Sequence, residues 1–419
     1  MPDAVPVERL RDYVRRRLFT PHRPGSPPRV GVEVEAIVVD ARTRRPLPVR
    51  GDGPCCGVAL VRDAARSHGW VELAAAHGAP RWRTATGGVV GFEPGGQVEY
   101  GTVPFRSLRA LLDDVIVTLE ALRDSAADRG AELLEVGIDP WKEVADVPLQ
   151  LDDDRYRRMD AYFAAFGGAG RRMMRQTAAL QVNLDLGDDE EERWLRWRVL
   201  GRASPYVAAA FANSRCHAGS DSGHASHRAI TWLEVDPQRT GVVAAGSGLD
   251  EAVEEYTRFA LAAPWMLDPR VRAPSRPADY APFAAAIASG SARAADWRTH
   301  LTTLFPDVRP RGWLELRSID ALPVSRMALP VMTLSGLVYD RAALRAADER
   351  IPEPDADLAR RSASAGMDDP VIASVARDLV GIGMAGHARL PSPLRCDERA
   401  CDSPPAWRSS WPRAAAAPP

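Results

Sequence analysis

The sequence predicts an α+β protein built on an open, mainly antiparallel sheet, with helices on one face and a functional site on the other. Four well-separated segments alternate polar with apolar side chains, as strands with one buried face do. Helical patterns lie between these segments, but without the strict period of a parallel β–α–β sheet. The polar faces of the four segments would together line an acidic concavity.

The first of these segments, residues 31–35, has the sequence GVEVE and follows a predicted amphipathic helix at residues 5–18. Strand side chains alternate with period two, so Glu33 and Glu35 leave one face and the intervening valines leave the other. This strand therefore has one apolar side and one anionic side. Prolines and glycines at residues 46–54 predict turns after it.

The second acidic segment, residues 91–101, has the sequence GFEPGGQVEYG. We interpret it as a second strand that carries Glu93 and Glu99, with Val98 and Tyr100 on either side of Glu99. Its acidic side could face the first strand. The glycine pair of this segment could approach a phosphate, but turn glycines are the commoner explanation.

The clearest helix is predicted at residues 107–129, where leucine and valine recur on one face. Ser107 can cap its start and Gly130 its end. We expect this helix to cover the apolar side of the sheet. Further helical patterns occupy residues 189–200, 249–263, 326–348 and 369–383.

Two more segments repeat the strand design of the first. Residues 179–185 alternate three polar side chains with leucine and valine: Gln181, Asn183 and Asp185. Residues 312–317 place Glu315 and Arg317 on one side and leucines on the other. Residues 213–232 read as a loop that enters a strand, and the sequence DPQRTG after it reads as a rigid turn.

Composition excludes several classes of protein. The 419 residues are 45% hydrophobic and 26% charged, and 54 basic residues against 56 acidic ones leave a net charge of −2, unlike a nucleic-acid binder. No stretch of 18 apolar residues or apolar signal core is present, and the few cysteines suit a reducing compartment, so we expect a cytoplasmic protein without a membrane partner. We expect one catalytic domain at residues 1–390 and a disordered tail at 391–419.

The carboxylates of the polar faces predict a metal site. Buried carboxylates repel one another and are costly without a cation. They are hard oxygen donors and no Cys/His spacing favours zinc, so Mg²⁺, or alternatively Mn²⁺, fits best. A single Glu-x-Glu strand is more often a solvated face. Five carboxylates on three segments favour the metal instead: Glu33, Glu35, Glu93, Glu99 and Glu315.

Arginine is the expected phosphate ligand, because Lys142 is the only lysine and no Walker-type loop is present. Arg228 next to Trp232 could grip a carboxylate, although a surface arginine beside a core tryptophan is equally compatible with the pattern. Cys216 and three nearby histidines match no zinc spacing, so we interpret them as a polar loop near a substrate. These histidines are His217, His224 and His227.

Six motifs, in their order along residues 8 to 390, resemble one family. They are GVEVE, EPGGQVEYG, MMRQTAALQVNLD, ANS followed by GxxSxRxxxW, DPQRTG, and WRTHLTTLFPDVRPRGWLELRSIDALP. The chain resembles glutamate–cysteine ligases of the plant and bacterial type, including the actinobacterial branch that feeds ergothioneine synthesis. GVEVE alone would be a weak signal, but the combination is specific.

This resemblance implies a glutamine-synthetase-like sheet with the active site on its polar face. There, ATP would phosphorylate the γ-carboxylate of glutamate, and the amino group of cysteine would displace phosphate, giving γ-glutamylcysteine. Its partners would be these small molecules. The five glutamates would hold magnesium, and Arg228 and Trp232 would bind substrate. Arg317 would face the phosphates or the acyl phosphate, with Arg311 as a weaker phosphate candidate. Met174, Thr177, Gln181 and Asn183 would line the glutamate and nucleotide side.

Two departures from the family pattern concern the substrates: the first bears on how the glutamate carboxylate is bound, and the second on the shape of the acceptor pocket. Asp160 follows the RYRRM segment where plant-like members commonly have arginine, and Arg215-Cys216 follows ANS where proline and an apolar residue are usual. A ligase that uses a different amine therefore remains an alternative. A third hypothesis is a non-enzymatic, ligase-like binding or regulatory protein. The chain retains all five acidic positions, Arg228 and Arg317, and this argues against a degraded active site.

Overall fold

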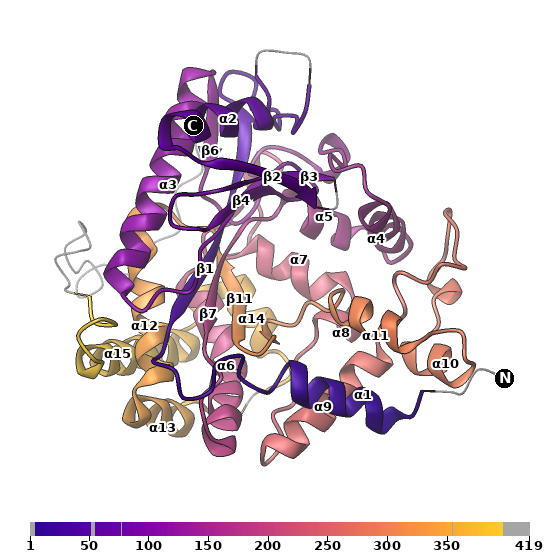
Figure 1. Cartoon of the computed structure of the whole chain (residues 1–419), viewed down its shortest axis with the longest axis vertical. Helices are drawn as coiled ribbons and strands as arrows, with labels where there is room; N and C mark the ends of the chain where they lie inside the picture. The colour runs from indigo at the N-terminus through magenta and orange to yellow at the C-terminus, as the bar shows by residue number, and fades with distance from the viewer. Residues whose placement is uncertain (1–4, 52–54, 77, 354, 397–419) are drawn as a thin grey trace.

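The computed structural model describes residues 5–51, 55–76, 78–353 and 355–396, and it confirms the predicted α+β class. Within these residues, nine strands form one open sheet in the order β10-β11-β7-β1-β5-β4-β3-β2, with β6 paired to the far half of β1 (Figure 1). Every neighbouring pair in this sheet is antiparallel.

The strands of this sheet are β1 (Val30–Asp40), β2 (Val71–Ala76), β3 (Ala79–Arg83), β4 (Val89–Phe92), β5 (Val98–Gly101), β6 (Ala131–Leu134), β7 (Ala179–Leu184), β10 (Val308–Pro310) and β11 (Leu314–Asp320). A separate small hairpin consists of β8 (Cys216–His217) and β9 (Ser220–Asp221).

The α-helices are α1 (Val7–Arg17), α2 (Gly57–His68), α3 (Leu108–Asp128), α4 (Asp154–Ala165), α5 (Ala169–Gln176), α6 (Glu190–Ala210), α7 (His227–Val235), α8 (Pro237–Thr240), α9 (Leu249–Ala262), α10 (Phe283–Ala288), α11 (Ala294–Leu301), α12 (Ala328–Tyr339), α13 (Arg341–Arg350), α14 (Leu358–Ala365) and α15 (Pro370–Arg389).

The main core lies on the apolar face of the sheet. Val32 and Val34 of β1 are buried with residues of α3, α6, α12 and α15, which cover this face (Figure 1). The polar side is flanked by α4, α5 and α7, which share a second, smaller core that includes Phe163, Met174 and Trp232. Helices therefore pack on both sides of the sheet, and the polar face is flanked by this second core.

The strongest helix prediction is confirmed at α3. The Ser107 hydroxyl accepts a hydrogen bond from the Ala110 amide at 3.2 Å, and Gly130 follows with a φ of +68°. The pattern at residues 326–348 is instead divided into α12 and α13, because Asp340 has an extended backbone and caps α13 by accepting from the Ala343 amide.

Two strand predictions are wrong. Residues 91–101 form a hairpin and not one strand: β4 ends at Phe92, Glu93 lies in the turn, and Glu99 lies in β5. Gly96, with a φ of +93°, permits this turn. The segment after residue 213 enters α7 and not a strand, because Ser226 caps a helix there by accepting from the Ala229 amide at 3.0 Å.

Two remaining predictions concern the ends and the membrane. The domain boundary at residue 390 stays a prediction; Leu394 and Cys396 beyond it are buried, and residues 397–419 lie outside the described part of the chain. Among the described residues, the structure has no helix long and apolar enough to cross a bilayer.

Gly95, in the β4–β5 turn, packs against α5 so closely that a Cβ atom there would lie 1.9 Å from the Arg175 carbonyl oxygen. Gly95→Ala should therefore push the turn, and Glu93 with it, away from α5. We expect the free energy of unfolding to fall by about 1–3 kcal/mol, measured by urea denaturation. Gly201→Ala is the matched control, because nothing lies within 4 Å of its added Cβ; equal losses in both variants would contradict this account.

Candidate active site

Strand register brings the predicted polar residues to one face of the sheet. Glu35 of β1 lies opposite Glu99 of β5, and Glu33 lies opposite Gln181 of β7. On the next strand, Glu315 of β11 lies opposite Asn183 of β7. Directly opposed residues in an antiparallel pair project to the same side. The structure thus gathers side chains from four adjacent strands into one polar set.

One half of this set consists of half-buried carboxylates: Glu33, Glu35, Glu93 and Glu99. Burial, then the neighbouring charges of Glu315 and Glu99, raise the pKa of Glu33 to about 7. Burial and Glu99 likewise raise the pKa of Glu35 to about 7. Burial also raises the pKa of Glu93 and Glu99, and their carboxyl groups are hydrogen-bonded to each other. These groups hold protons more tightly than ordinary carboxyls.

The other half of the set is cationic and surrounds Glu315, whose side chain is 0% exposed. Arg309 Nη2 donates to both of its oxygens at 2.8 and 3.1 Å, Arg311 Nη1 donates at 3.0 Å, and Arg317 donates as well. Burial alone would raise the pKa of Glu315, but the three arginines hold it below its usual range. Three guanidinium groups on one carboxylate leave a local excess of positive charge.

Two amide side chains hydrogen-bond to the anionic half, and one of them, Gln181, joins it to the cationic half. Gln181 donates from Nε2 to Glu35 at 2.9 Å and accepts from Arg317 Nη1 at 2.7 Å. Asn183 donates to Glu33 at 3.4 Å and accepts from the Trp313 indole at 2.8 Å. A side-chain amide can serve both partners because it carries a donor and an acceptor. Gln181 therefore fixes the spacing of the two halves, and Asn183 holds Glu33 relative to Trp313.

The anionic half fits a divalent cation chemically. Nearby arginines, chiefly Arg317, lower the pKa of its four carboxylates only in part, because burial and mutual repulsion outweigh them. A bound cation would relieve that repulsion. Among the described residues, however, no three Asp, Glu, His or Cys side chains already stand in a metal-binding arrangement. Binding would thus require the carboxyl groups to lose protons and reorient.

The predicted pair Arg228 and Trp232 lies on α7, beside this set. Arg228 is only 3% exposed; its Nη2 donates to the Arg317 carbonyl at 2.7 Å, and its guanidinium lies 4.8 Å from the centre of the Trp232 ring. The Trp232 indole donates to the Phe305 carbonyl at 3.0 Å. Arg228 also opposes the rise in the pKa of Glu35. The sequence motif thus places a buried cation against Arg317 and near enough to Glu35 to lower its pKa.

Met174 and Thr177, at the end of α5, lie beside the polar face, but their side chains contact the protein interior. Met174 is part of the second core. The Thr177 hydroxyl donates to the Met173 carbonyl at 2.5 Å, and its own carbonyl accepts from Gln97 at 2.9 Å. Their predicted role in lining the substrate side remains a prediction.

Asp160, the departure from the family pattern, bridges α4 and α5. Its carboxylate accepts from Arg171 at 2.8 Å and from Arg175. His217 and His227 stack with ring centres 4.5 Å apart, and burial, with His217 next, lowers the pKa of His227 to about 4. The sequence alone predicts neither arrangement, because each depends on a contact between two separate elements: α4 with α5 for Asp160, and β8 with α7 for the two histidines.

Two residues of the site were missed from the sequence. Arg309 and Arg311 are two residues apart, so strand alternation would place their side chains on the same face. That spacing could have predicted Arg309 as a further partner of Glu315. Asp320 ends β11 and is 1% exposed, and its contacts come from distant segments that no local pattern reveals.

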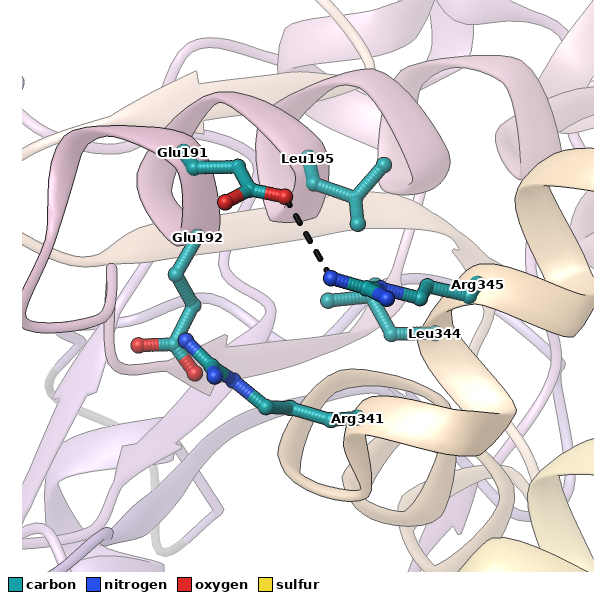
Figure 2. A pocket seen from close by; sticks show the side chains of 6 residues that line it. All are labelled: Glu191, Glu192, Leu195, Arg341, Leu344 and Arg345. Carbon is teal, nitrogen blue, oxygen red and sulfur yellow. Dashed lines mark hydrogen bonds and ion pairs between the residues drawn. The ribbon is translucent and has the colours of Figure 1, made fainter.

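A surface hollow between α6 and α13 lies apart from this polar set (Figure 2). It is lined by Glu191, Glu192, Leu195, Arg341, Leu344 and Arg345. Figure 2 shows Arg345 reaching across it to Glu191, an ion pair of 3.4 Å. None of its lining residues belongs to the candidate site.

The stability of the metal-free protein should fall as pH rises. Glu33 and Glu35 have pKa values of about 7 when folded, against 4.5 ordinarily, so the stability that their protonated forms contribute is complete below pH 4.5 and is lost through about pH 7. The loss is about 3–4 kcal/mol per group for the full shift. Melting temperatures in EDTA from pH 4.5 to 8 test this. The double variant Glu33→Gln, Glu35→Gln should flatten the curve; an unchanged slope would contradict the assignment.

Comparison with known proteins decides the family. The model for glutamate–cysteine ligase family 2 matches residues 29–391, which is most of the chain. The chain belongs to glutamate–cysteine ligase family 2. The resemblance read from the six sequence motifs is thereby confirmed, and the match includes every strand of the polar set.

Named members of glutamate–cysteine ligase family 2 are similar to this chain. Glutamate–cysteine ligase EgtA of Mycobacterium tuberculosis (strain ATCC 25618 / H37Rv) is 36% identical over 298 residues, covering 68% of this chain and 66%, just under two thirds, of that protein. EgtA of Mycolicibacterium smegmatis is 33% identical over 354 residues, covering 81% and 76%. The chloroplastic glutamate–cysteine ligase of Arabidopsis thaliana is 31% identical over 275 residues, covering 61% and 50%.

A solved structure is also similar. The glutamate–cysteine ligase of Francisella tularensis, in complex with AMP, has a TM-score of 0.46 and 12% sequence identity to this chain, covering 90% of this chain and 81% of that one.

Proposed function

We propose that this family member is an ATP-dependent ligase that joins the γ-carboxylate of glutamate to the amino group of cysteine. The observation that carries the proposal is the pairing of an anionic half and an arginine-rich half on one sheet face, bridged by Gln181. Phosphoryl transfer needs both: cations on the phosphoryl oxygens and ligands for a metal ion. The names of the similar ligases support the same reaction.

The arginine-rich half would bind the phosphates. Arg311, whose side chain is 43% exposed, can reach an incoming nucleotide, and Arg317 stands between it and the anionic half. Guanidinium groups bind phosphate oxygens in a fixed fork and so provide orientation as well as charge. Arg309 and Glu315 would hold these two arginines in place, because all three share one carboxylate.

The anionic half would hold Mg²⁺, with Mn²⁺ as an alternative, through Glu33, Glu35, Glu93 and Glu99. When bound, the ion would supply positive charge that neutralises the phosphate oxygens. The resemblance implies Glu315 as a fifth ligand, but its oxygens would first have to leave the arginines that they accept from. Gln181 and Asn183 would keep the carboxylates facing the phosphates.

The reaction has two steps. An oxygen of the glutamate γ-carboxylate attacks the γ-phosphorus of ATP, the bond to the β-phosphate oxygen breaks, and ADP leaves. The amino nitrogen of cysteine then attacks the acyl carbon, its proton passes to solvent, and inorganic phosphate leaves with the former carboxylate oxygen. Arg317, which belongs to the arginine-rich half and is linked to the anionic half through Gln181, would stabilise the charge on the transferring phosphoryl group. Arg228 and Trp232 would bind substrate next to it.

Product formation tests the proposal. Purified protein with glutamate, cysteine, ATP and Mg²⁺ should release one ADP per γ-glutamylcysteine, detected by a coupled assay and by mass spectrometry. Release of no ADP with any amine would refute a ligase function. The product would serve ergothioneine synthesis, as the resemblance to that branch implies.

A panel of amines separates cysteine from other acceptors. Arg215, in the departure after ANS, pairs at 2.8 Å with Asp221 on the exposed β8–β9 hairpin. Asp160 is likewise occupied by two arginines and is not free to bind a substrate amine. We therefore expect cysteine to have the highest kcat/KM of the panel. A strong preference for another amine would favour the alternative ligase.

A further inference from the structure

We propose that Asp320 is a positioning residue that holds both Arg228 and Arg317 in their working geometry; this inference rests on the proposed function. Asp320 ends β11, the strand that also carries Glu315 and Arg317. It is 1% exposed, so it does not meet solvent and acts through its neighbours. Its hydrogen-bond partners are Asn213 and Ser214, which precede the β8–β9 hairpin, and Ser226, which precedes α7.

The Asp320 carboxylate is hydrogen-bonded at both oxygens. Oδ2 accepts from the Asn213 backbone N–H and from the Ser214 hydroxyl, each at 2.7 Å. Oδ1 accepts from the Ser226 hydroxyl at 3.0 Å. Buried polar groups satisfied in this way define a single arrangement. Gly137 leaves the space for it, since a Cβ there would lie 2.5 Å from the Asp320 carboxyl carbon.

The two serine hydroxyls connect Asp320 to the first turn of α7. The Ser214 oxygen accepts from the Arg228 amide at 3.1 Å, and the Ser226 oxygen accepts from the Ala229 amide at 3.0 Å. Because each hydroxyl donates to Asp320, its oxygen is oriented toward these helix amides. The carboxylate thereby fixes where α7 begins and where the Arg228 side chain leaves it.

Asp320 also faces the Arg228 side chain directly. Arg228 Nη1 lies 3.7 Å from Oδ1, while Nη2 donates to the Arg317 carbonyl at 2.7 Å. The guanidinium is thus held between a carboxylate and the backbone of the other arginine. Removing the carboxylate would leave a buried charge uncompensated, so Arg228 would move and release its hold on Arg317.

Asp320→Asn tests this without changing the side-chain shape. We expect kcat/KM for glutamate to fall about 10²-fold, with KM for glutamate raised, because small displacements of positioning groups have such effects. Asp236→Asn is the matched control: Asp236 is also buried, caps α8 beyond the other end of α7, and accepts from the Tyr162 hydroxyl at 2.6 Å. It should lower the melting temperature and leave kcat and KM unchanged.

A double-mutant cycle distinguishes positioning from general destabilisation. If Asp320 acts through Arg228, then Asp320→Asn should change kcat/KM little in the Arg228→Ala background, although it lowers kcat/KM strongly in the parent. Additive losses would overturn the proposal. If Asp320→Asn does not fold, Gly137→Ala, which displaces the carboxylate sterically, replaces it in the cycle with the same expected outcome.

Crystal structures of the parent and Asp320→Asn proteins provide a readout apart from activity. The hydrogen bond from Arg228 to the Arg317 carbonyl should be lost in the variant; an unmoved guanidinium would overturn the proposal. A parent protein that releases no ADP would refute the proposed function, and this comparison would still decide whether Asp320 positions the two arginines.

Discussion

Arg317→Ala should lower kcat about 10³-fold or more, the loss typical of an arginine that stabilises a transferring phosphoryl group. Arg317 donates to Gln181 at 2.7 Å and to Glu315, so its guanidinium stands where the anionic and cationic halves meet. Its removal would take the positive charge from the reacting centre and leave Gln181 without one partner. Steady-state release of ADP measures the effect.

Two further variants separate charge from geometry at this position. Arg317→Lys keeps the charge but not the planar fork, and should recover only part of the lost rate. Arg345→Ala, at the surface hollow of Figure 2, is the matched control and should keep the parent kcat, because Arg345 pairs at 3.4 Å with exposed Glu191, away from the candidate site. A loss of less than tenfold in Arg317→Ala would contradict the role assigned to Arg317.

Glu99→Gln should abolish Mg²⁺-dependent nucleotide binding without destabilising the metal-free protein. Glu99 lies among like charges, and burial, followed by Glu93, raises its pKa well above the ordinary value. A neutral glutamine removes that repulsion but also removes a metal ligand. We therefore expect binding and stability to change in opposite directions at a pH where Glu99 is ionised in the parent protein, an outcome typical of a residue retained for function.

Isothermal titration with ATP and Mg²⁺, together with melting temperatures in EDTA, measures both effects of Glu99→Gln. Glu132→Gln is the control, since Glu132 is an exposed glutamate of β6 that pairs with Arg44. Retained Mg²⁺-dependent binding in Glu99→Gln would contradict the metal assignment. A large fall in its melting temperature would contradict the charge repulsion inferred for this group.

The polar face of the sheet could be predicted because it depends on local alternation. Glu33 and Glu35 in β1, Gln181 in β7 and Arg317 in β11 follow a period of two that any antiparallel strand imposes. Glu99 was placed on this face correctly although its segment is a hairpin. The turn at Gly96 changes the chain direction, and the strand after it keeps the same alternation.

The helical wall of the site could not be predicted in the same way. Ile230, Thr231 and Trp232 favour strands by propensity, yet they lie in α7. The helix is fixed by Ser226, whose hydroxyl is held by Asp320, 94 residues further along the chain. Such long-range contacts override local preference, and a single sequence does not reveal them.

The most direct test of the account follows an oxygen atom. Glutamate labelled with ¹⁸O in its γ-carboxylate is incubated with ATP, cysteine and Mg²⁺, and the inorganic phosphate and nucleotide products are analysed by mass spectrometry. If the γ-carboxylate is phosphorylated and the amine then displaces phosphate, each inorganic phosphate carries one ¹⁸O atom and the nucleotide product is unlabelled ADP. Unlabelled phosphate, or label transferred to AMP, would contradict the mechanism.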